Sequence, residues 1–107
     1  MKKISALAML VLLIAPMAAR SATPAVHIKN DAYSPQTLTV TAGQTVTFTN
    51  DDDDAHTITA TDGSFDSKGV DTNGVWRHVF QKPGRYPYFC ELHPFMKGTI
   101  VVRAAAP

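Results

Sequence analysis

The chain has 107 residues, with ten lysines and arginines, nine aspartates and glutamates, and a formal net charge of +1. This length accommodates a single domain. Cys90 is the only cysteine, which excludes a disulfide within the chain. The basic residues form no run or patch of the kind that binds nucleic acid, which excludes that class of partner.

The first residues have the three-part pattern of a secretory signal peptide. A basic start at residues 1–3 is followed by an apolar run at residues 4–15 and then by Pro16 and small residues. The apolar run is shorter than the roughly 20 residues that cross a bilayer as a helix, so cleavage is favoured over an uncleaved membrane anchor. We predict a signal peptide at residues 1–21 and export to the periplasm. Cleavage after Ser21 fits best, and cleavage after residue 19 or 22 stays open.

The predicted domain, residues 22–107, is small and acidic. Lys2, Lys3 and Arg20 leave with the signal peptide whereas all nine acidic residues stay, so the domain has a net charge of −2. Secreted domains of this size usually add disulfides or a metal to a modest core. Because no disulfide is possible, and because a free thiol is a liability in an oxidising compartment, the composition favours a metal bound to the cysteine.

After the signal peptide, short strand-forming runs alternate with turn signals. At residues 45–49, Val46 and Phe48 alternate with threonines, which places the two apolar side chains on one buried face. No window has a sustained helical period, and many short strands with regular turns predict an all-β sandwich or barrel. We expect strands at residues 25–28, 38–40, 45–49, 56–59, 75–80, 85–90 and 98–103, with an irregular stretch between Asp62-Gly63 and Asn73-Gly74.

Three side chains that bind metals lie within seven residues, from Cys90 through His93 to Met96. Two histidines and a cysteine with a distant methionine form the kind of site that cycles between Cu(I) and Cu(II). The second histidine must come from elsewhere, and His56 is the best candidate because it begins a predicted strand directly after a loop. Zinc is a weaker fit, since structural zinc sites prefer several cysteines. The sequence therefore predicts one copper ion held by these four residues.

Elimination supports this interpretation. Met1, Met9 and Met17 lie in the predicted signal peptide, so Met96 is the only methionine in the domain. Taken singly, a buried cysteine or methionine is an ordinary core residue. Their spacing around one histidine favours a metal site.

The other two histidines are expected to be structural or solvated. His78 alternates with Trp76 and Phe80, which suits a histidine that faces the core. His27 lies early in the first predicted strand. Neither is close in sequence to the cysteine.

The segment at residues 84–98, GRYPYFCELHPFMKG, resembles the ligand loop of the cupredoxins, in which a strand of the form G-x-Y-x-Y-x-C leads into the metal site. Two residues separate Cys90 from His93 and two separate His93 from Met96, as in the amicyanin group of that family. Residues 42–50, AGQTVTFTN, resemble the strand before the first histidine of these proteins. The resemblance covers nearly the whole predicted domain.

The resemblance implies a Greek-key β-sandwich with copper at one end. His56, Cys90 and His93 would be its strong ligands and Met96 its weak axial ligand. The implied activity is the transfer of single electrons between redox proteins, with a c-type cytochrome or a dehydrogenase as partner. A copper carrier or buffer without a redox partner is the alternative. A copper enzyme is disfavoured, because the sequence has no second ligand cluster.

The resemblance also implies where a partner docks. One edge of the His93 ring would reach the surface, so docking is expected near His93, Pro94 and Phe95, with Leu92 as a possible further apolar contact. A Phe95 side chain packed inward over the metal is an equal alternative. We expect a monomer that does not contact the membrane after signal cleavage.

Three features near the predicted ligands leave alternatives open. The four aspartates at residues 51–54 form either a solvated turn, which we favour, or a docking patch whose association with a basic partner slows as salt is added. Thr57 stands where many relatives have an asparagine that braces the ligand loops, and its shorter hydroxyl can make a similar bond. Glu91 stands where relatives have Ser or Thr, and its carboxylate either lowers the reduction potential or points to solvent.

Overall fold

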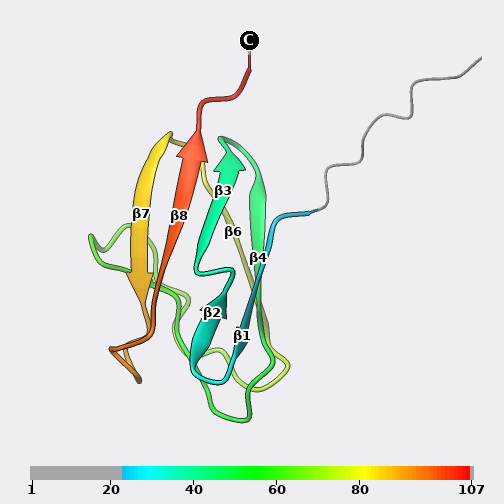
Figure 1. The fold of residues 1–107 in the computed structure, drawn as a ribbon, viewed down its shortest axis with the longest axis vertical. Coiled ribbons are helices and arrows are strands. Elements are labelled where there is room, and N and C mark those ends of the chain that lie inside the picture. The colour runs from blue at the N-terminus through cyan, green and yellow to red at the C-terminus, as the bar shows by residue number, and fades with distance from the viewer. Residues whose placement is uncertain (1–22, 107) are drawn as a thin grey trace, which may run out of the picture.

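The computed structural model describes residues 23–106, and the predicted signal peptide lies outside this range. Within the described part, no helix has the length and apolarity needed to cross a lipid bilayer. Eight strands make up two four-stranded sheets (Figure 1). They are β1 (Ala25–Lys29), β2 (Ala32–Ser34), β3 (Thr37–Thr41), β4 (Thr45–Asn50), β5 (Thr59–Ala60), β6 (Val75–Val79), β7 (Gly84–Phe89) and β8 (Lys97–Arg103).

The chain crosses repeatedly between the two sheets. One sheet has the order β2-β1-β4-β6 and the other β3-β8-β7-β5. Strands β1 and β4 are parallel, as are β3 and β8, and the remaining neighbours are antiparallel. This arrangement confirms the predicted all-β Greek-key sandwich.

The core lies between the sheets and follows from strand alternation. Val46 and Phe48 of β4 are fully buried, whereas the intervening threonines are partly exposed, as the sequence predicts. Tyr88 of β7 contacts the rings of Phe48 and Tyr33 edge-on, with centroids 5.8 and 4.7 Å apart. These aromatic contacts link the two sheets through their centre.

Two details of the strand prediction are wrong. The short strand β2 was not expected; it follows a tight turn in which Asn30 and Asp31 have φ values of 53° and 54°. The expected strand at residues 56–59 is reduced to an isolated bridge between His56 and Val70, and only its last residue, Thr59, belongs to a strand, β5. The backbone N–H groups between them bond to side chains instead of a neighbouring strand, which ends the ladder.

The loops that carry the predicted ligands lie at one end of the sandwich. Figure 1 shows the loop after β4 (green) and the β7–β8 connection (orange) at the end opposite the C-terminus. The turn between β1 and β2 lies at the same end, because β1 runs parallel to β4. The fold therefore brings three connections together around the site.

Candidate metal centre

His56, Cys90 and His93 converge although 34 residues separate the first from the second. The Cys90 sulfur lies 3.7 Å from Nδ1 of His56 and 3.8 Å from Nδ1 of His93. The three ligand atoms all lie within 4.8 Å of one another. His56 and Cys90 are fully buried, and His93 is half-buried.

These separations fit a shared metal ion. A metal with bonds of about 2.3 Å to sulfur and about 2.0 Å to nitrogen separates the two ligand atoms by about 3.7 Å when the bonds meet near 120°. The observed sulfur–nitrogen distances of 3.7 and 3.8 Å agree closely with this separation. One soft sulfur and two imidazole nitrogens in this arrangement form a donor set that suits copper.

Met96 is 2% exposed and belongs to the same loop. Its backbone N–H donates to the carbonyl of His93 at 2.8 Å, and the N–H of Cys90 donates to the carbonyl of Met96 at 3.2 Å. These two bonds close the seven-residue segment into a compact loop. The close spacing of ligands in the sequence therefore becomes a fixed local geometry.

Backbone hydrogen bonds position His56 from the opposite side. The N–H of His56 donates to the carbonyl of Val70 at 3.1 Å, and the N–H of Val70 donates back at 2.8 Å. The next N–H, of Thr57, donates to the Cys90 sulfur at 3.3 Å. This bond holds the sulfur beside the segment that carries His56.

Thr57 also braces the two ligand loops through its side chain. Its hydroxyl oxygen accepts the backbone N–H of Glu91 at 2.8 Å and lies 2.9 Å from the hydroxyl of Thr59. The shorter hydroxyl thus makes the bond that the sequence left open. The Glu91 side chain is exposed, as in the solvent-facing alternative.

The aspartate run has a buried member that the sequence analysis missed. Asp52 is buried, and its carboxylate lies 2.9 Å from Nε2 of His56. Burial by itself raises the pKa of Asp52, but the backbone N–H groups of Asp31 and Asn30, together with His56, outweigh burial and hold this pKa below its ordinary value. Four identical residues in a row gave no signal of which one turns inward.

The remaining aspartates are exposed, in agreement with the favoured solvated turn. The carboxylate of Asp51 lies 2.7 Å from Nδ1 of His27 at the surface, so His27 is a solvent-exposed histidine outside the metal centre. Asp53 and Asp54 are exposed.

His78 packs among aromatic rings on the inner side of β6. Its ring stacks on Trp76 with a centroid distance of 5.1 Å and an interplanar angle of 13°, and it contacts Phe65 and Phe80. Its ring lies on the same side as Trp76 and Phe80, as expected, but it is only partly buried and is held by ring contacts. Its partial burial lowers its pKa.

Exposed apolar residues flank the half-buried His93 in the ligand loop. Phe95 is 70% exposed and Leu92 is 57% exposed, and Pro94 between them is also exposed. The rings of His93 and Phe95 meet edge-on at 6.2 Å. Phe95 therefore points outward, not inward over the ligands.

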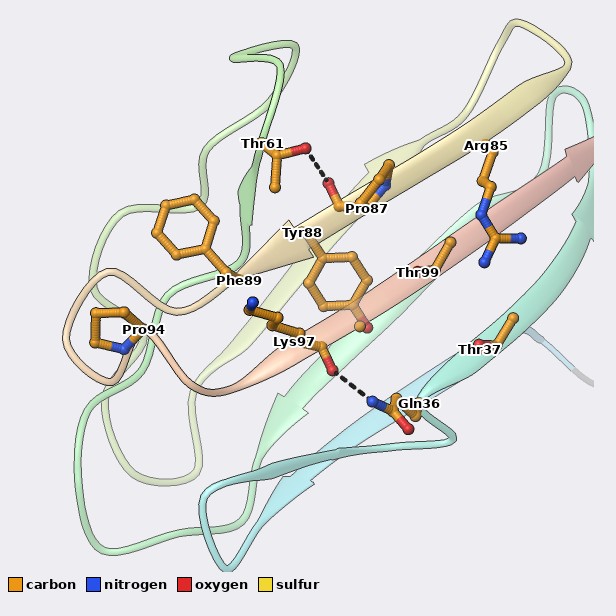
Figure 2. A pocket seen from close by; sticks show the side chains of 11 residues that line it. Gln36, Thr37, Thr61, Arg85, Pro87, Tyr88, Phe89, Pro94, Lys97 and Thr99 are labelled. Carbon is orange, nitrogen blue, oxygen red and sulfur yellow. Dashed lines mark hydrogen bonds between the residues drawn. The ribbon is translucent and has the colours of Figure 1, made fainter.

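A separate groove of about 590 Å³ runs along the outer face of the β3-β8-β7-β5 sheet (Figure 2). Figure 2 shows Phe89 and Pro94 at the end nearest the ligand loop and Arg85 at the other end. The four predicted ligands are not among the residues that line it. The groove is therefore distinct from the metal centre.

Comparison with known proteins places this arrangement in a family. A family model described as a cupredoxin-like domain matches residues 3–102. Amicyanin-alpha of Methylorubrum extorquens is 33% identical over 82 residues, which cover 72% of this chain and 69% of that protein.

Solved structures with the same fold include copper proteins. A reduced Cu(I) form of an amicyanin variant matches with a TM-score of 0.71 and 26% identity, covering 80% of this chain and 87% of that one. A copper-containing nitrite reductase from Thermus scotoductus matches with a TM-score of 0.73 and 28% identity over 79% of this chain, but over only 23% of the enzyme. With the fold, the ligand loop and the family match in agreement, the chain belongs to the cupredoxin-like domain family.

Proposed function

We propose that this protein binds one copper ion through His56, Cys90, His93 and Met96 and carries single electrons between redox proteins of the periplasm. The observation that carries the proposal is the convergence of Cys90 with both histidines at 3.7 and 3.8 Å in a largely buried site. A copper ion bound there would take up and release one electron by cycling between Cu(II) and Cu(I). The predicted signal peptide is the basis for the proposed compartment.

The protein's contribution is a rigid, shielded set of donors. The loop bonds around Cys90, the bridge between His56 and Val70, and the brace at Thr57 each fix a ligand-bearing segment to a neighbour. Ligands that move little between oxidation states add little reorganisation to each electron transfer. A site assembled in this way favours transfer over release of the metal.

The exposed edge of His93 supplies the route to a partner. The apolar patch of Leu92, Pro94 and Phe95 surrounds it, and we propose that redox partners, such as a c-type cytochrome or a dehydrogenase, dock there. Brief redox encounters bury little area, which suits a patch of this size. The groove in Figure 2 has no role in this proposal.

The proposal is tested by adding Cu(II) to the purified protein and recording the visible spectrum. We expect an intense blue colour that ascorbate bleaches, and Cys90→Ser should abolish the colour because serine removes the thiolate. Met96→Leu should keep the colour and raise the reduction potential, since only the weak axial donor is lost. A protein that stays blue after Cys90→Ser would show that the ligand assignment is wrong.

The same sample separates an electron carrier from a copper carrier. A carrier or buffer should bind copper without the blue colour and pass it to a chelating acceptor. An electron carrier should keep its copper in the presence of that acceptor while it exchanges electrons.

A further inference from the structure

Asp52 is the one carboxylate of the aspartate run that is buried against a predicted ligand. Its Oδ2 lies 2.9 Å from Nε2 of His56, the ring nitrogen that faces away from Cys90. Because a carboxylate there accepts a hydrogen bond from an N–H at Nε2, the proton of the neutral ring stays on Nε2, and the other ring nitrogen, Nδ1, is left with its lone pair free. Nδ1 is the nitrogen that lies 3.7 Å from the cysteine sulfur.

The carboxylate is itself held in place from several sides. Its Oδ1 accepts the N–H of Asn30 at 2.7 Å, and its Oδ2 accepts the N–H of Asp31 at 3.0 Å. These two donors point at it because both turn residues adopt left-handed backbone angles. The backbone N–H of Asp52 donates to the side-chain oxygen of the fully buried Asn50 at 2.9 Å. The aspartate is thus a fixed part of the site and not a mobile surface charge.

Its charge acts on the metal through a short path. Asp52 lies one imidazole ring away from the proposed copper position, and its side chain is 12% exposed, so solvent screens it only partly. A nearby negative charge stabilises Cu(II) more than Cu(I). The carboxylate of Asp31 lies farther away, 3.6 Å from Nε2, and is 43% exposed.

We propose that Asp52 is a positioning residue, which fixes His56 in the tautomer that leaves Nδ1 free for the metal and biases the bound copper toward Cu(II). This inference rests on the proposed function for its redox part. The proposed effect of Asp52 on the tautomer of His56 does not depend on a bound metal. Hydrogen-bonded carboxylates behind ligating histidines commonly change metal affinity by about 10- to 100-fold when they are removed.

Two substitutions separate the two effects. Asp52→Ala removes both the acceptor and the charge. Asp52→Asn removes the charge. Its amide oxygen can take the Oδ2 position and still accept from Nε2 and from the N–H of Asp31, while its NH2 group then faces the N–H of Asn30 and loses that one bond. Asp31→Asn is the matched control, because it removes a nearby charge while keeping the backbone N–H and a residue type that tolerates the left-handed turn.

The first measurement is the nitrogen NMR spectrum of His56 in the purified protein without copper. We expect the proton on Nε2 in the wild type, in Asp52→Asn and in Asp31→Asn, and a mixture of tautomers in Asp52→Ala. Amide spectra of each variant establish that it is folded, and if the Ala variant is not, the wild-type spectrum still tests which ring nitrogen of His56 carries the proton. A wild-type proton on Nδ1, or an unchanged tautomer in Asp52→Ala, would overturn the positioning role.

The second measurement is the ratio of Cu(II) to Cu(I) binding constants. We expect this ratio to fall by about tenfold in both Asp52 variants, with the blue band retained in Asp52→Asn. A wild-type ratio in Asp52→Asn, or an equal fall in Asp31→Asn, would overturn the role of the Asp52 charge. Failure of the wild type to turn blue would instead refute the proposed function, and the tautomer result would remain a separate test.

Discussion

Thr57 makes two contacts with the other ligand loop within a single residue. Its backbone N–H reaches the Cys90 sulfur, and its hydroxyl accepts the N–H of Glu91. The first contact survives any side chain other than proline, whereas the second depends on the hydroxyl. Substitution at this position therefore tests the brace without touching a ligand.

Thr57→Val should lower the free energy of unfolding by about 1–2 kcal/mol, because valine keeps the shape but leaves a backbone donor without its acceptor. Urea unfolding of the metal-free protein measures this change. Thr57→Ser is the control and should lose much less, since it keeps the hydroxyl. A larger loss in Thr57→Ser than in Thr57→Val would show that the methyl group, not the hydrogen bond, stabilises the site.

His78 gives the stability a predictable pH dependence. Burial lowers its pKa from the ordinary 6.5, so below pH 6.5 the unfolded chain takes up a proton that the folded protein does not. Stability is therefore fully present above this pH and decreases as the pH falls toward the lower folded pKa. The backbone N–H of Lys68 lowers the pKa of Asp66 from its ordinary 3.8, so Asp66 changes the stability only in a separate, more acidic pH range.

His78→Phe should flatten the part of the stability curve between pH 7 and pH 5, because phenylalanine keeps the aromatic contacts and does not titrate. Urea unfolding at several pH values measures the slope. An unchanged slope in this range would assign the pH dependence to other groups.

At the scale of elements, the pairing of β7 with β8 depends on a glycine. Gly98 lies opposite Tyr88, and a Cβ atom at this position would overlap the Tyr88 ring. The tyrosine is 1% exposed and packs between the sheets, so it has no room to move aside. The absence of a side chain at Gly98 thus makes space for a central core ring.

Gly98→Ala should destabilise the fold by about 1–3 kcal/mol through overpacking. Gly69→Ala is the matched control and should be close to neutral, because a Cβ there meets no atom within 4 Å. Chemical unfolding of both variants provides the comparison. A neutral Gly98→Ala would mean that the β7–β8 pair has more freedom than this packing allows.

The elements that sequence could predict are those specified locally. The alternation in β4 identified its buried face, and the spacing of Cys90, His93 and Met96 identified a loop that local backbone bonds close. The expected strand at residues 56–59 is interrupted because the N–H groups of Thr57 and Ile58 bond to the side chains of Cys90 and Ser67 and not to a neighbouring strand.

Long-range geometry decided the rest of the site. The inward turn of Asp52 depends on two N–H groups more than 20 residues away, which no local pattern indicates. The orientation of Phe95 was an open alternative, because an aromatic residue in a ligand loop suits either a core or a docking surface. Only the folded loop distinguishes them.

At the scale of the whole molecule, exposed aspartates and the apolar patch lie at the same end of the sandwich. Phe95 and its neighbours surround the edge of His93, while exposed aspartates of the loop after β4 lie at the same end. Docking through the patch should therefore depend on apolar contact, with added salt modulating it.

Phe95→Ser should slow electron self-exchange between oxidised and reduced copies by about tenfold, equivalent to about 1.4 kcal/mol, with no change in the visible spectrum. NMR line broadening in mixed samples measures this rate. Val79→Ser is the control. Val79 is also exposed, but it pairs with Thr45 at the start of β4, at the opposite end of that strand from the loop that leads to His56. A rate unaffected by Phe95→Ser would place the route of electron transfer elsewhere.

The proposed function depends most directly on Cys90 and both histidines binding the same metal ion. X-ray absorption at the copper edge of the loaded protein tests this by counting and identifying the nearest atoms. We predict one short sulfur and two nitrogen neighbours, with the sulfur lost in Cys90→Ser. A copper environment of nitrogen and oxygen alone in the wild type would contradict the assignment.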